Sequence, residues 1–523
     1  MATKTSKAKS ATSKKAASKK AATKKVATKK AATKKTSTKK AATKTPTSTT
    51  NAELRIRMYR VGFGDFFLVT VPAADGPQHI LIDCGVTPGQ TKLGDIGTIK
   101  DAVAHMADVT NKKLALIIVT HRHQDHIVGF SRSAEIFKDF TVGAVWMSFW
   151  ETEYDPNEKK EKPMAFAFQE ELTSLASNMQ AHMAARGADD PDSDEILAML
   201  QNATGLDQAE LAAAGGAAAA GKPGKGGGTN AASLTFLKTG LKLKPEYYAK
   251  GDTPKVPKVL ADAGLTAQIL GPPPADAFDF LKLMDLKKGV GQFLGEGGDG
   301  SAKKFDPFGT QWHRDAAAFS KTAFREWERG LKKKASAAME TAIQNAQPDL
   351  LFTAAKTLDK ILNNQSLVVL FTFNGKKLLF AGDAQGGNWE YWMFGGTPNN
   401  APSADQIDKT SKAILGNLDF YKVGHHGSTN ATPVSAVEAM GGDFASMCST
   451  QEGSFGKVAN NSEVPRIPLL TALSKKTTLV RSDQFAVTLP DNEVPAVKGS
   501  PDALPKPARG RFEEGPIYID YFL

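Results

Sequence analysis

The sequence predicts an α/β protein in which two β-sheets pack face to face and helices cover their outer faces. One observation is an apolar run at residues 114–119, which has the length and composition of a buried strand and leads directly into a polar turn. A second is that strand patterns gather in two parts of the chain, residues 51–150 and 351–523, each with helical segments. A third is that strands of both parts end at His or Asp side chains.

The elements of the first part are short apolar or alternating runs bounded by glycine and polar residues. Its predicted strands span residues 54–61, 66–71, 79–82, 114–119 and 142–149, and its predicted helices span residues 93–110 and 130–140. The first two strands form a hairpin around Gly62 and Gly64. The third strand ends at Asp83, whose carboxylate either orients a metal-bound histidine or caps a turn.

The second part mirrors the first. Its predicted strands span residues 366–373, 377–380 and 418–423. The first two form a hairpin around Asn374, which is followed by glycine, and this hairpin leads to Asp383. The third strand runs into His425 and His426. Both parts therefore deliver potential metal ligands from the ends of strands.

The polar turn at residues 120–129 concentrates such ligands, because it contains His121, His123, Asp125 and His126. Three imidazoles and a carboxylate are more than one tetrahedral ion with an open position can use, so we expect two neighbouring divalent ions. The alternative is a chance cluster of polar residues that cap a helix. Histidine is rare in this chain, at 9 of 523 residues, so a chance cluster of this kind is improbable.

Residues 151–350 differ in character from the two parts that flank them. They predict a mainly helical insertion, which we expect to fold over one rim of the body as a substrate lid. Its expected helices span residues 164–186, 193–202, 275–286 and 314–345, with one strand at residues 265–270 and a low-complexity Ala/Gly/Lys loop at residues 212–228.

Residues 1–50 hold 16 Lys and no acid, so the rest of the chain has 66 − 16 = 50 basic and 55 acidic residues. The segment repeats Ala-Ala-Thr-Lys-Lys and resembles linker-histone-like tails in composition. It has little to bury, so we expect disorder. Its lysines would bind nucleic-acid phosphates without sequence preference, unless the tail serves only solubility. The lysines expected to bind include Lys24, Lys25, Lys29, Lys30, Lys34, Lys35, Lys39 and Lys40.

The rest of the composition indicates a cytoplasmic protein. Cys84 and Cys448 are too few for a disulfide framework and lack CxxC spacing, which suits a reducing compartment. No apolar run approaches the roughly 18 residues that span a bilayer, and the N-terminus lacks the apolar region of a secretory signal. We expect no membrane partner, and an association with the nucleoid if the tail binds DNA.

Several motifs together resemble those of metallo-β-lactamase-fold hydrolases. The HxHxDH signature of this family matches residues 121–126, its first acidic motif matches Asp83, and its later bridging aspartate matches Asp383. Val-Gly-Phe-Gly-Asp at residues 61–65 and His-His-Gly-Ser at residues 425–428 resemble motifs of one branch, which contains the soluble domain of the ComEC/Rec2 DNA-uptake proteins. The resemblance implies a four-layer αββα sandwich.

The resemblance also implies two metal sites. His121 and His123 would hold one ion with a further His, and Asp125 and His126 would hold the other with a late His. Asp383 would bridge the two ions, and a hydroxide between them would be the nucleophile.

Two points stay open in this comparison of motifs. Either His425 or His426 is the late ligand, and the other would polarise or protonate the leaving group. No His occupies the usual third-ligand position of the second part, where residues 362–366 resemble the Asn-Asn-x-Ser of the ComEC-like branch. This would place Asn364 and Ser366 beside the ligands, where they orient them. Fewer nitrogen donors favour an oxygen-richer shell, which makes Mn²⁺ as credible as Zn²⁺.

The function expected from these features is that of a dinuclear metal-dependent hydrolase that cleaves phosphodiesters of nucleic acid. One alternative is a small-molecule hydrolase for lactones, thioesters or phosphoesters, because this fold hosts many substrates. Another is a non-catalytic, nucleoid-associated binding protein, which metal analysis would separate from the enzymes. The expected catalytic residues are Asp125, Asp383, His425 and His426.

Overall fold

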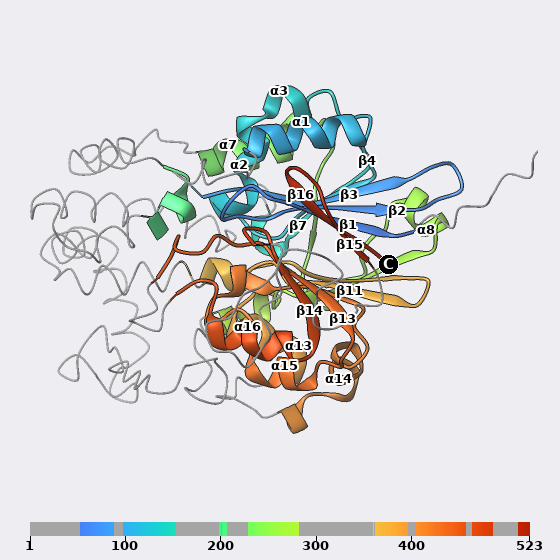
Figure 1. The fold of residues 1–523 in the computed structure, drawn as a ribbon. Helices are drawn as coiled ribbons and strands as arrows, with labels where there is room; N and C mark the ends of the chain where they lie inside the picture. Colours follow the sequence, from blue (N-terminus) through green and yellow to red (C-terminus); the bar gives the residue numbers. More distant parts are fainter. Residues whose placement is uncertain are drawn as a thin grey trace, which may run out of the picture. The chain divides into compact units, whose positions relative to one another are not determined.

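In this computed structural model the protein has a mixed α/β fold, and its described part is built around two large β-sheets (Figure 1). The structure describes residues 53–87, 98–152, 198–199, 201–206, 229–281, 359, 361–395, 404–456, 463–484 and 511–523. Within these ranges no helix has the length and apolar character needed to cross a membrane.

The first sheet has eight strands in the order β15-β16-β1-β2-β3-β5-β7-β8. They span Arg511–Glu514 (β15), Tyr518–Phe522 (β16), Arg55–Tyr59 (β1), Phe66–Val71 (β2), Gln78–Cys84 (β3), Leu116–Val119 (β5), Val145–Ser148 (β7) and Glu246–Tyr248 (β8). The predicted hairpin of the first two strands is confirmed, because β1 and β2 pair antiparallel. From β3 to β8 the strands run parallel, so their carboxyl ends meet at one edge of the sheet.

The second sheet has six strands in the order β14-β13-β12-β11-β10-β9. They span Thr477–Arg481 (β14), Phe444–Cys448 (β13), Phe420–Lys422 (β12), Lys376–Phe380 (β11), Val368–Phe373 (β10) and Leu265–Gly271 (β9). The predicted hairpin between β10 and β11 is confirmed, and its turn uses positive φ angles at Asn374 (48°) and Gly375 (78°). The strands β11 to β14 run parallel.

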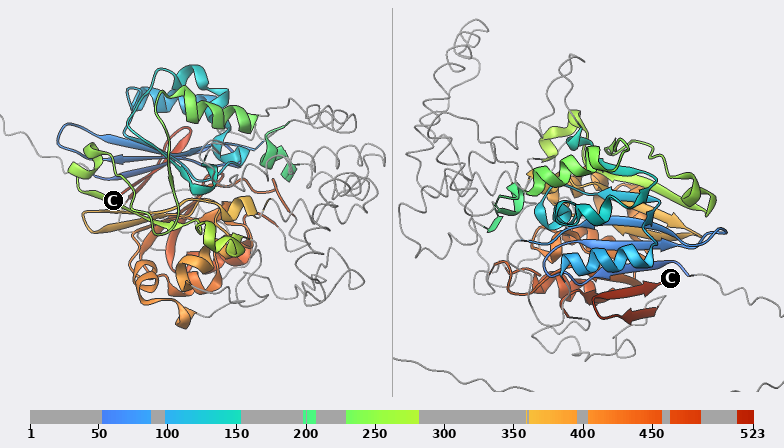
Figure 2. Two further views of the ribbon diagram at one scale, coloured as in Figure 1. Left: turned by 180° about the vertical axis from the view of Figure 1, so that it is seen from behind. Right: turned by 90° about the horizontal axis from the view of Figure 1, so that it is seen from above.

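The two sheets face each other across a shared apolar core (Figure 1 and Figure 2). Phe67 of β2 and Phe380 of β11 meet there with ring centroids 6.1 Å apart. Helices pack on the outer faces through two further apolar clusters. They are α1 (Ile99–Val109), α2 (Gln124–Arg132), α3 (Ala134–Phe137) and α7 (Thr229–Thr235) on the first sheet, and α13 (Gly386–Phe394), α14 (Lys409–Leu415), α15 (Val434–Ala439) and α16 (Ile467–Ser474) on the second.

The helices of the first part differ from the expectation in their bounds. The helix expected at residues 93–110 is α1, which begins at Ile99 behind a capping box of Thr98 and Asp101; residues 93–97 lie outside the described ranges. The helix expected at residues 130–140 is instead the pair α2 and α3. Because α2 already begins at Gln124, part of the polar turn is the first turn of a helix.

The strand expected at residues 142–149 was also wrong in its bounds. It is split into β6 (Thr141–Val142), which pairs with β4 (Lys113–Leu114) in a small sheet of its own, and β7. Gly143 lies in the break, where an added Cβ would be 2.5 Å from the carbonyl oxygen of Ala115.

The stretch expected to be a helical insertion contributes to both sheets. The strand expected at residues 265–270 is confirmed as β9, whereas β8 was not predicted. Short helical segments occur at η3 (Ala275–Ala277) and α9 (Phe278–Leu281), and residues 201–204 are helical too. The helices expected at residues 164–186 and 314–345, the loop at residues 212–228 and the tail at residues 1–50 lie outside the described part of the chain.

Candidate metal centre

The predicted site residues lie at the carboxyl ends of neighbouring parallel strands. Asp83 is the second-last residue of β3, and residues 121–126 follow β5 beside it. In the second sheet Asp383 follows β11, and His425 and His426 follow β12 beside it. Because the sheets face each other, these strand ends from the two parts of the chain meet at one edge of the core. This is where ligands bind in open α/β sheets.

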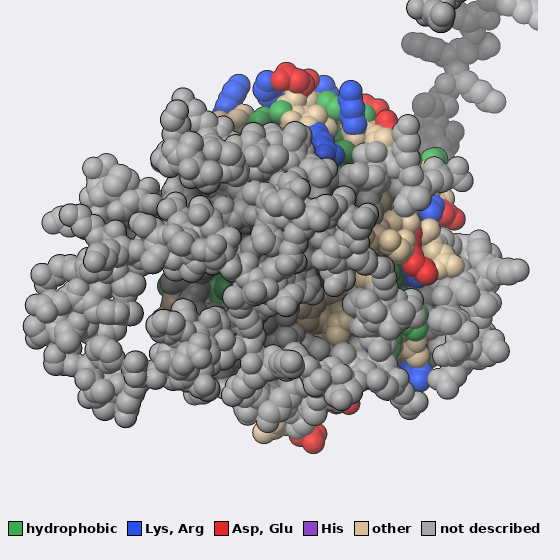
Figure 3. Space-filling view, turned by 90° about the vertical axis from the view of Figure 1, so that its left-hand side faces the viewer, with side chains coloured by type: hydrophobic (Ala, Val, Ile, Leu, Met, Phe, Trp, Pro, Cys, Tyr) green, Lys and Arg blue, Asp and Glu red, His purple; other side chains and the backbone are tan. Residues whose placement is uncertain are grey.

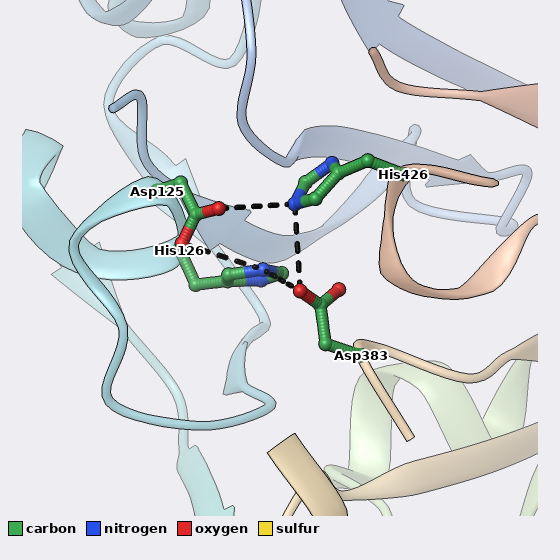
Figure 4. Close-up of side chains that lie close together, drawn as sticks. All are labelled: Asp125, His126, Asp383 and His426. Carbon is green, nitrogen blue, oxygen red and sulfur yellow. Dashed lines mark hydrogen bonds and ion pairs between the residues drawn. The ribbon is translucent and has the colours of Figure 1, made fainter. Parts of the chain in front are cut away.

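Four of the predicted residues form one buried group (Figure 4). Asp125, His126, Asp383 and His426 each offer a ligand atom, and these atoms lie within 4.8 Å of one another. His426 Nε2 lies 3.1 Å from Asp125 Oδ2 and 3.4 Å from Asp383 Oδ2. His126 Nε2 lies 3.1 Å from Asp383 Oδ2. The four side chains come from two separate parts of the chain and point at a common space.

Opposite charges hold this group together. Burial lowers the pKa of His126 and His426, but the facing carboxylates outweigh it, raising the pKa of His126 well above its usual value and that of His426 to about 10. Burial likewise raises the pKa of Asp125 and Asp383. The two histidines outweigh this effect, and they lower the pKa of Asp125 to about 2 and that of Asp383 well below its usual value.

The donor set fits a divalent cation. Asp125 Oδ1 and His126 Nε2 are buried and have no hydrogen-bond partner among the described residues. Such groups are costly to bury unless something satisfies them, and a cation would. Two carboxylates and two imidazoles are a mixed oxygen and nitrogen set, which suits both Zn²⁺ and Mn²⁺.

Asp83 lies against His126, the position expected of a residue that orients a metal ligand. The Oδ2 atom of Asp83 lies 2.8 Å from His126 Nδ1 and accepts a hydrogen bond from the hydroxyl of Thr120 at 2.6 Å. Its Oδ1 atom accepts a hydrogen bond from the backbone N–H of Thr120 at 2.8 Å. With Nδ1 turned to Asp83, Nε2 is left to face the buried group. Asp65, Asp83 and His126 are close enough to be a second cation group. We interpret it as support, because Asp65 pairs with Lys422 and Asp83 with Thr120.

His121 and His123 form a pair beside the buried group. His121 Nε2 lies 3.0 Å from His123 Nδ1, and the rings of His121 and His126 have centroids 4.1 Å apart. Burial lowers the pKa of His121 well below its usual value and that of His123 to about 4, so both rings are neutral at pH 7 and keep a lone pair for a cation. The far Nε2 of His123 lies 3.5 Å from Asp359 Oδ1.

The structure shows different surroundings for His425 and His426, the two adjacent histidines of which either could be the late ligand. Both have left-handed backbone angles, with φ of 41° at His425 and 52° at His426, and their ring centroids lie 6.2 Å apart. His426 is fully buried in the group of four. The His425 side chain is 21% exposed, and its Nε2 lies 3.9 Å from Asp383 Oδ2. Its Nδ1 lies 2.7 Å from Ser428 Oγ, which leaves Nε2 facing the site.

Asn364 and Ser366 lie against the loop that carries Asp383. Ser366 Oγ accepts a hydrogen bond from the backbone N–H of Asp383 at 3.1 Å. Asn364 Oδ1 accepts from the backbone N–H groups of Gln385 and Asn388 at 3.2 and 3.0 Å. The two side chains therefore fix the backbone on both sides of the ligand, and neither belongs to the group of four.

Three further residues of the site were not predicted as site residues from the sequence. Asp65 was noted only as the last residue of the Val-Gly-Phe-Gly-Asp motif, and no role was predicted for Asp359. Lys422 is 1% exposed and pairs with Asp65. A signal existed for Lys422, because it follows Phe420 by two residues and so shares its inward face of the strand.

In comparisons with known proteins, no protein-family model matches this chain and no curated protein matches it significantly. The case for a function therefore rests on the residues of the site and on the fold that positions them.

Proposed function

We propose that this protein is a metal-dependent hydrolase with two divalent ions that cleaves phosphodiesters of nucleic acid. The observation that carries the proposal is the buried group of Asp125, His126, Asp383 and His426, whose ligand atoms converge although they come from both parts of the chain. A site of this kind, with adjoining neutral histidines, is suited to hold adjacent divalent ions.

The fold supports a class for this enzyme. Two facing sheets with helices outside, and ligands at the ends of strands in the order HxHxDH, Asp, His-His, resemble a four-layer metallo-β-lactamase-type sandwich of the ComEC-like branch. This fold is known to host several hydrolytic reactions, so the class does not by itself give the substrate.

The geometry supports a role for each ligand. Asp125, His126 and His426 would hold one ion, His121 and His123 would hold the other, and Asp383 would lie between them. Two bound ions of Zn²⁺ or Mn²⁺ would supply the Lewis acidity that activates water near neutral pH and stabilises the oxygens of a phosphodiester as they gain charge.

His425 is suited to polarise the leaving oxygen, or to protonate it when both ring nitrogens carry protons. Burial lowers the pKa of this ring, and its Nε2 also lies 3.4 Å from Asn363 Nδ2. His425 is the most exposed of these histidines, and its Nε2 faces the site while Ser428 Oγ and Asn430 Oδ1 hold the other end of the ring. Ser428 also donates a hydrogen bond to Asn430 Oδ1 at 2.8 Å, which makes both oxygens acceptors for an Nδ1–H. The ring can therefore present its Nε2 to a substrate.

Nucleic acid is the substrate class that best accounts for the distribution of charge. The chain outside residues 1–50 has 50 basic and 55 acidic residues, and the described part of the face in Figure 3 shows Lys and Arg interspersed with Asp and Glu. The 16 lysines of the tail would supply the attraction to phosphates that this body does not. Such a protein would work in the cytoplasm, close to the nucleoid.

A substrate screen tests this function. Purified protein loaded with Zn²⁺ or Mn²⁺ would be assayed against DNA, RNA, a bis-phosphodiester dye and a lactone. We expect hydrolysis of the phosphodiesters that chelation abolishes and that Asp383→Asn lacks, while the exposed-site control Asp405→Asn keeps it. A lactone or thioester hydrolysed far faster than any phosphodiester would instead favour a small-molecule hydrolase.

A further inference from the structure

We propose that Lys422 is a positioning residue of the metal centre, which fixes Asp383 from behind and joins the two parts of the chain that supply the ligands. The inference rests on the proposed metal centre, and it concerns a residue that is itself no ligand. It starts from the fact that Lys422 is only 1% exposed, which is rare for a lysine unless its charge is paired.

The strand brings the ammonium group between the sheets. Phe420 and Lys422 lie two residues apart on β12, so their side chains share one face, and Phe420 belongs to the core between the two sheets. Tyr421, on the opposite face, packs under the outer helices instead. Lys422 therefore reaches across the core towards the first sheet.

The partners of Lys422 come from both parts of the chain. Its Nζ pairs closely with Asp65 Oδ2 from the segment between β1 and β2, and it donates to the carbonyl oxygen of Gly382 at 3.2 Å. The backbone N–H of Asp65 in turn donates to the carbonyl oxygen of Asp125 at 2.8 Å. One ammonium group thus connects the segment that carries Asp125 with the segment that carries Asp383.

The same ammonium group distinguishes the two oxygens of Asp383. Its Oδ1 lies 3.6 Å from Lys422 Nζ, whereas its Oδ2 lies 3.1 Å from His126 Nε2 and 3.4 Å from His426 Nε2. Attraction to the ammonium therefore keeps Oδ1 at the back of the site and turns Oδ2 towards the ligands. Changing a residue that orients a metal ligand in this way typically costs about 10- to 100-fold in metal affinity or activity.

A test must separate two effects of Lys422 on metal affinity. Its ammonium group positions Asp383, which favours binding, but its positive charge also repels cations. Removing Lys422 alone would take the closest cationic partner from the buried Asp65 carboxylate, which then attracts cations and destabilises the fold. The double variant Lys422→Met with Asp65→Asn removes one positive and one negative charge, so the net charge of the site is unchanged. Its effect on metal affinity then reports how much the pair of Lys422 and Asp65 contributes to positioning the ligands that the two side chains contact, Asp383 beside Lys422 and the two histidines beside Asp65.

The experiment measures the affinity for Mn²⁺ and Zn²⁺ by calorimetry, alongside thermal unfolding without metal. We expect the double variant to bind metal about 10- to 100-fold more weakly than the wild type while still unfolding cooperatively. The control is Lys376→Met. Lys376 lies on the neighbouring strand β11 and pairs with Asp419, so this variant also loses a paired lysine, and it should keep full affinity.

Wild-type affinity in the folded double variant would overturn the inference, because a purely structural pair lowers stability without changing the affinity of the folded protein. If the double variant does not fold, Lys422→Gln with Asp65→Asn repeats the test with side chains that can still hydrogen-bond, and the same two outcomes decide it. A wild-type protein that binds no divalent ion would instead refute the metal centre itself.

Discussion

His425 and His426 show how strongly two adjacent residues can differ in surroundings. The left-handed turn at both positions sends His426 into the buried group and leaves His425 partly exposed at its edge. We therefore predict that His426→Ala loses bound metal and activity together. His425→Ala should keep its metal and lose rate, typically by about 10²- to 10⁴-fold, as expected when a proton donor is removed.

The check is metal content and single-turnover rate measured on the same samples. Asn430→Ala is a useful companion, because it weakens the interaction with His425 Nδ1 without touching the group of four, and it should lower the rate modestly at full metal content. Equal loss of metal in the two histidine variants would reject the division of roles.

For single residues, the sequence predicted which side chains belong to the site. It was less successful in predicting the role of each one. His121, Asp125, Asp383 and the histidine pair were all identified, because metal-ligating side chains at strand ends form a recognisable pattern. The burial of Lys422 was missed, because it depends on which face of β12 turns inward and on Asp65 from a distant segment. The spacing from Phe420 could have placed Lys422 on the inward face, but no spacing in the sequence reveals its pairing with Asp65.

At the scale of elements, β16 closes the first sheet against β1 with a buried ion pair. Arg57 on β1 lies directly opposite Asp520 on β16, and it donates two hydrogen bonds to this carboxylate at 2.7 and 2.6 Å. The guanidinium also lies 3.5 Å from the ring centroid of Tyr518. Both charges are 4% exposed, so neither can recover by hydration if its partner is removed.

We predict that Asp520→Ala lowers the free energy of unfolding by about 3 to 5 kcal/mol, because it leaves the Arg57 charge buried without a partner. Urea unfolding measures this. Glu513→Ala on the neighbouring strand β15 is the control, since its pair with Arg511 is solvent-exposed and should matter little. Similar stabilities for the two variants would show that the terminal hairpin is not held in this way.

Elements were predicted well where hydrophobic patterns are local and poorly where pairing is distant. The hairpins β1/β2 and β10/β11 follow from alternating or apolar runs around glycine turns. The edge strand β8 has three residues and pairs with β7 about a hundred residues earlier, so no local signal reveals it. The early start of α2 was missed because polar ligands occupy its first turn.

At the scale of the whole molecule, a buried histidine makes stability depend on pH. His79 on β3 is 6% exposed, and burial, with Arg55 and Arg57 nearby, lowers its pKa from 6.5 to about 4. The folded protein thus resists protonation of a ring that the unfolded chain protonates below pH 6.5. The stability from the neutral ring is present above pH 6.5 and is lost as the pH falls through 4, by (6.5 − 4) × 1.36, or about 3 kcal/mol at most.

We predict that His79→Gln loses less unfolding free energy than the wild type between pH 7 and pH 4. Chemical unfolding with a chelator present measures this without interference from metal. The comparison cancels the contribution of carboxylates, which titrate in both proteins. Parallel pH profiles for the two proteins would contradict the prediction.

The tail and the folded body should divide the work on nucleic acid between them. Deleting residues 2–50 should weaken binding equally for all sequences and flatten the dependence of log affinity on log salt, by about 0.9 for each duplex phosphate that the tail neutralises. Cleavage at saturating substrate should change little, because the deleted segment offers no His, Asp or Glu to the site. Affinity at low salt that survives the deletion would contradict this division.

The most direct test of the account is the number of metal ions that each chain holds. Purified protein would be equilibrated with Mn²⁺ or Zn²⁺, freed of excess metal and analysed for its metal-to-protein ratio, with Asp383→Asn measured beside it. The account predicts a ratio that approaches two for the wild type and a clear loss for the variant, because Asp383 faces His126 and His426 and is the residue proposed to bridge the two ions. A wild type without metal, or an Asp383→Asn protein that keeps two ions, would contradict it.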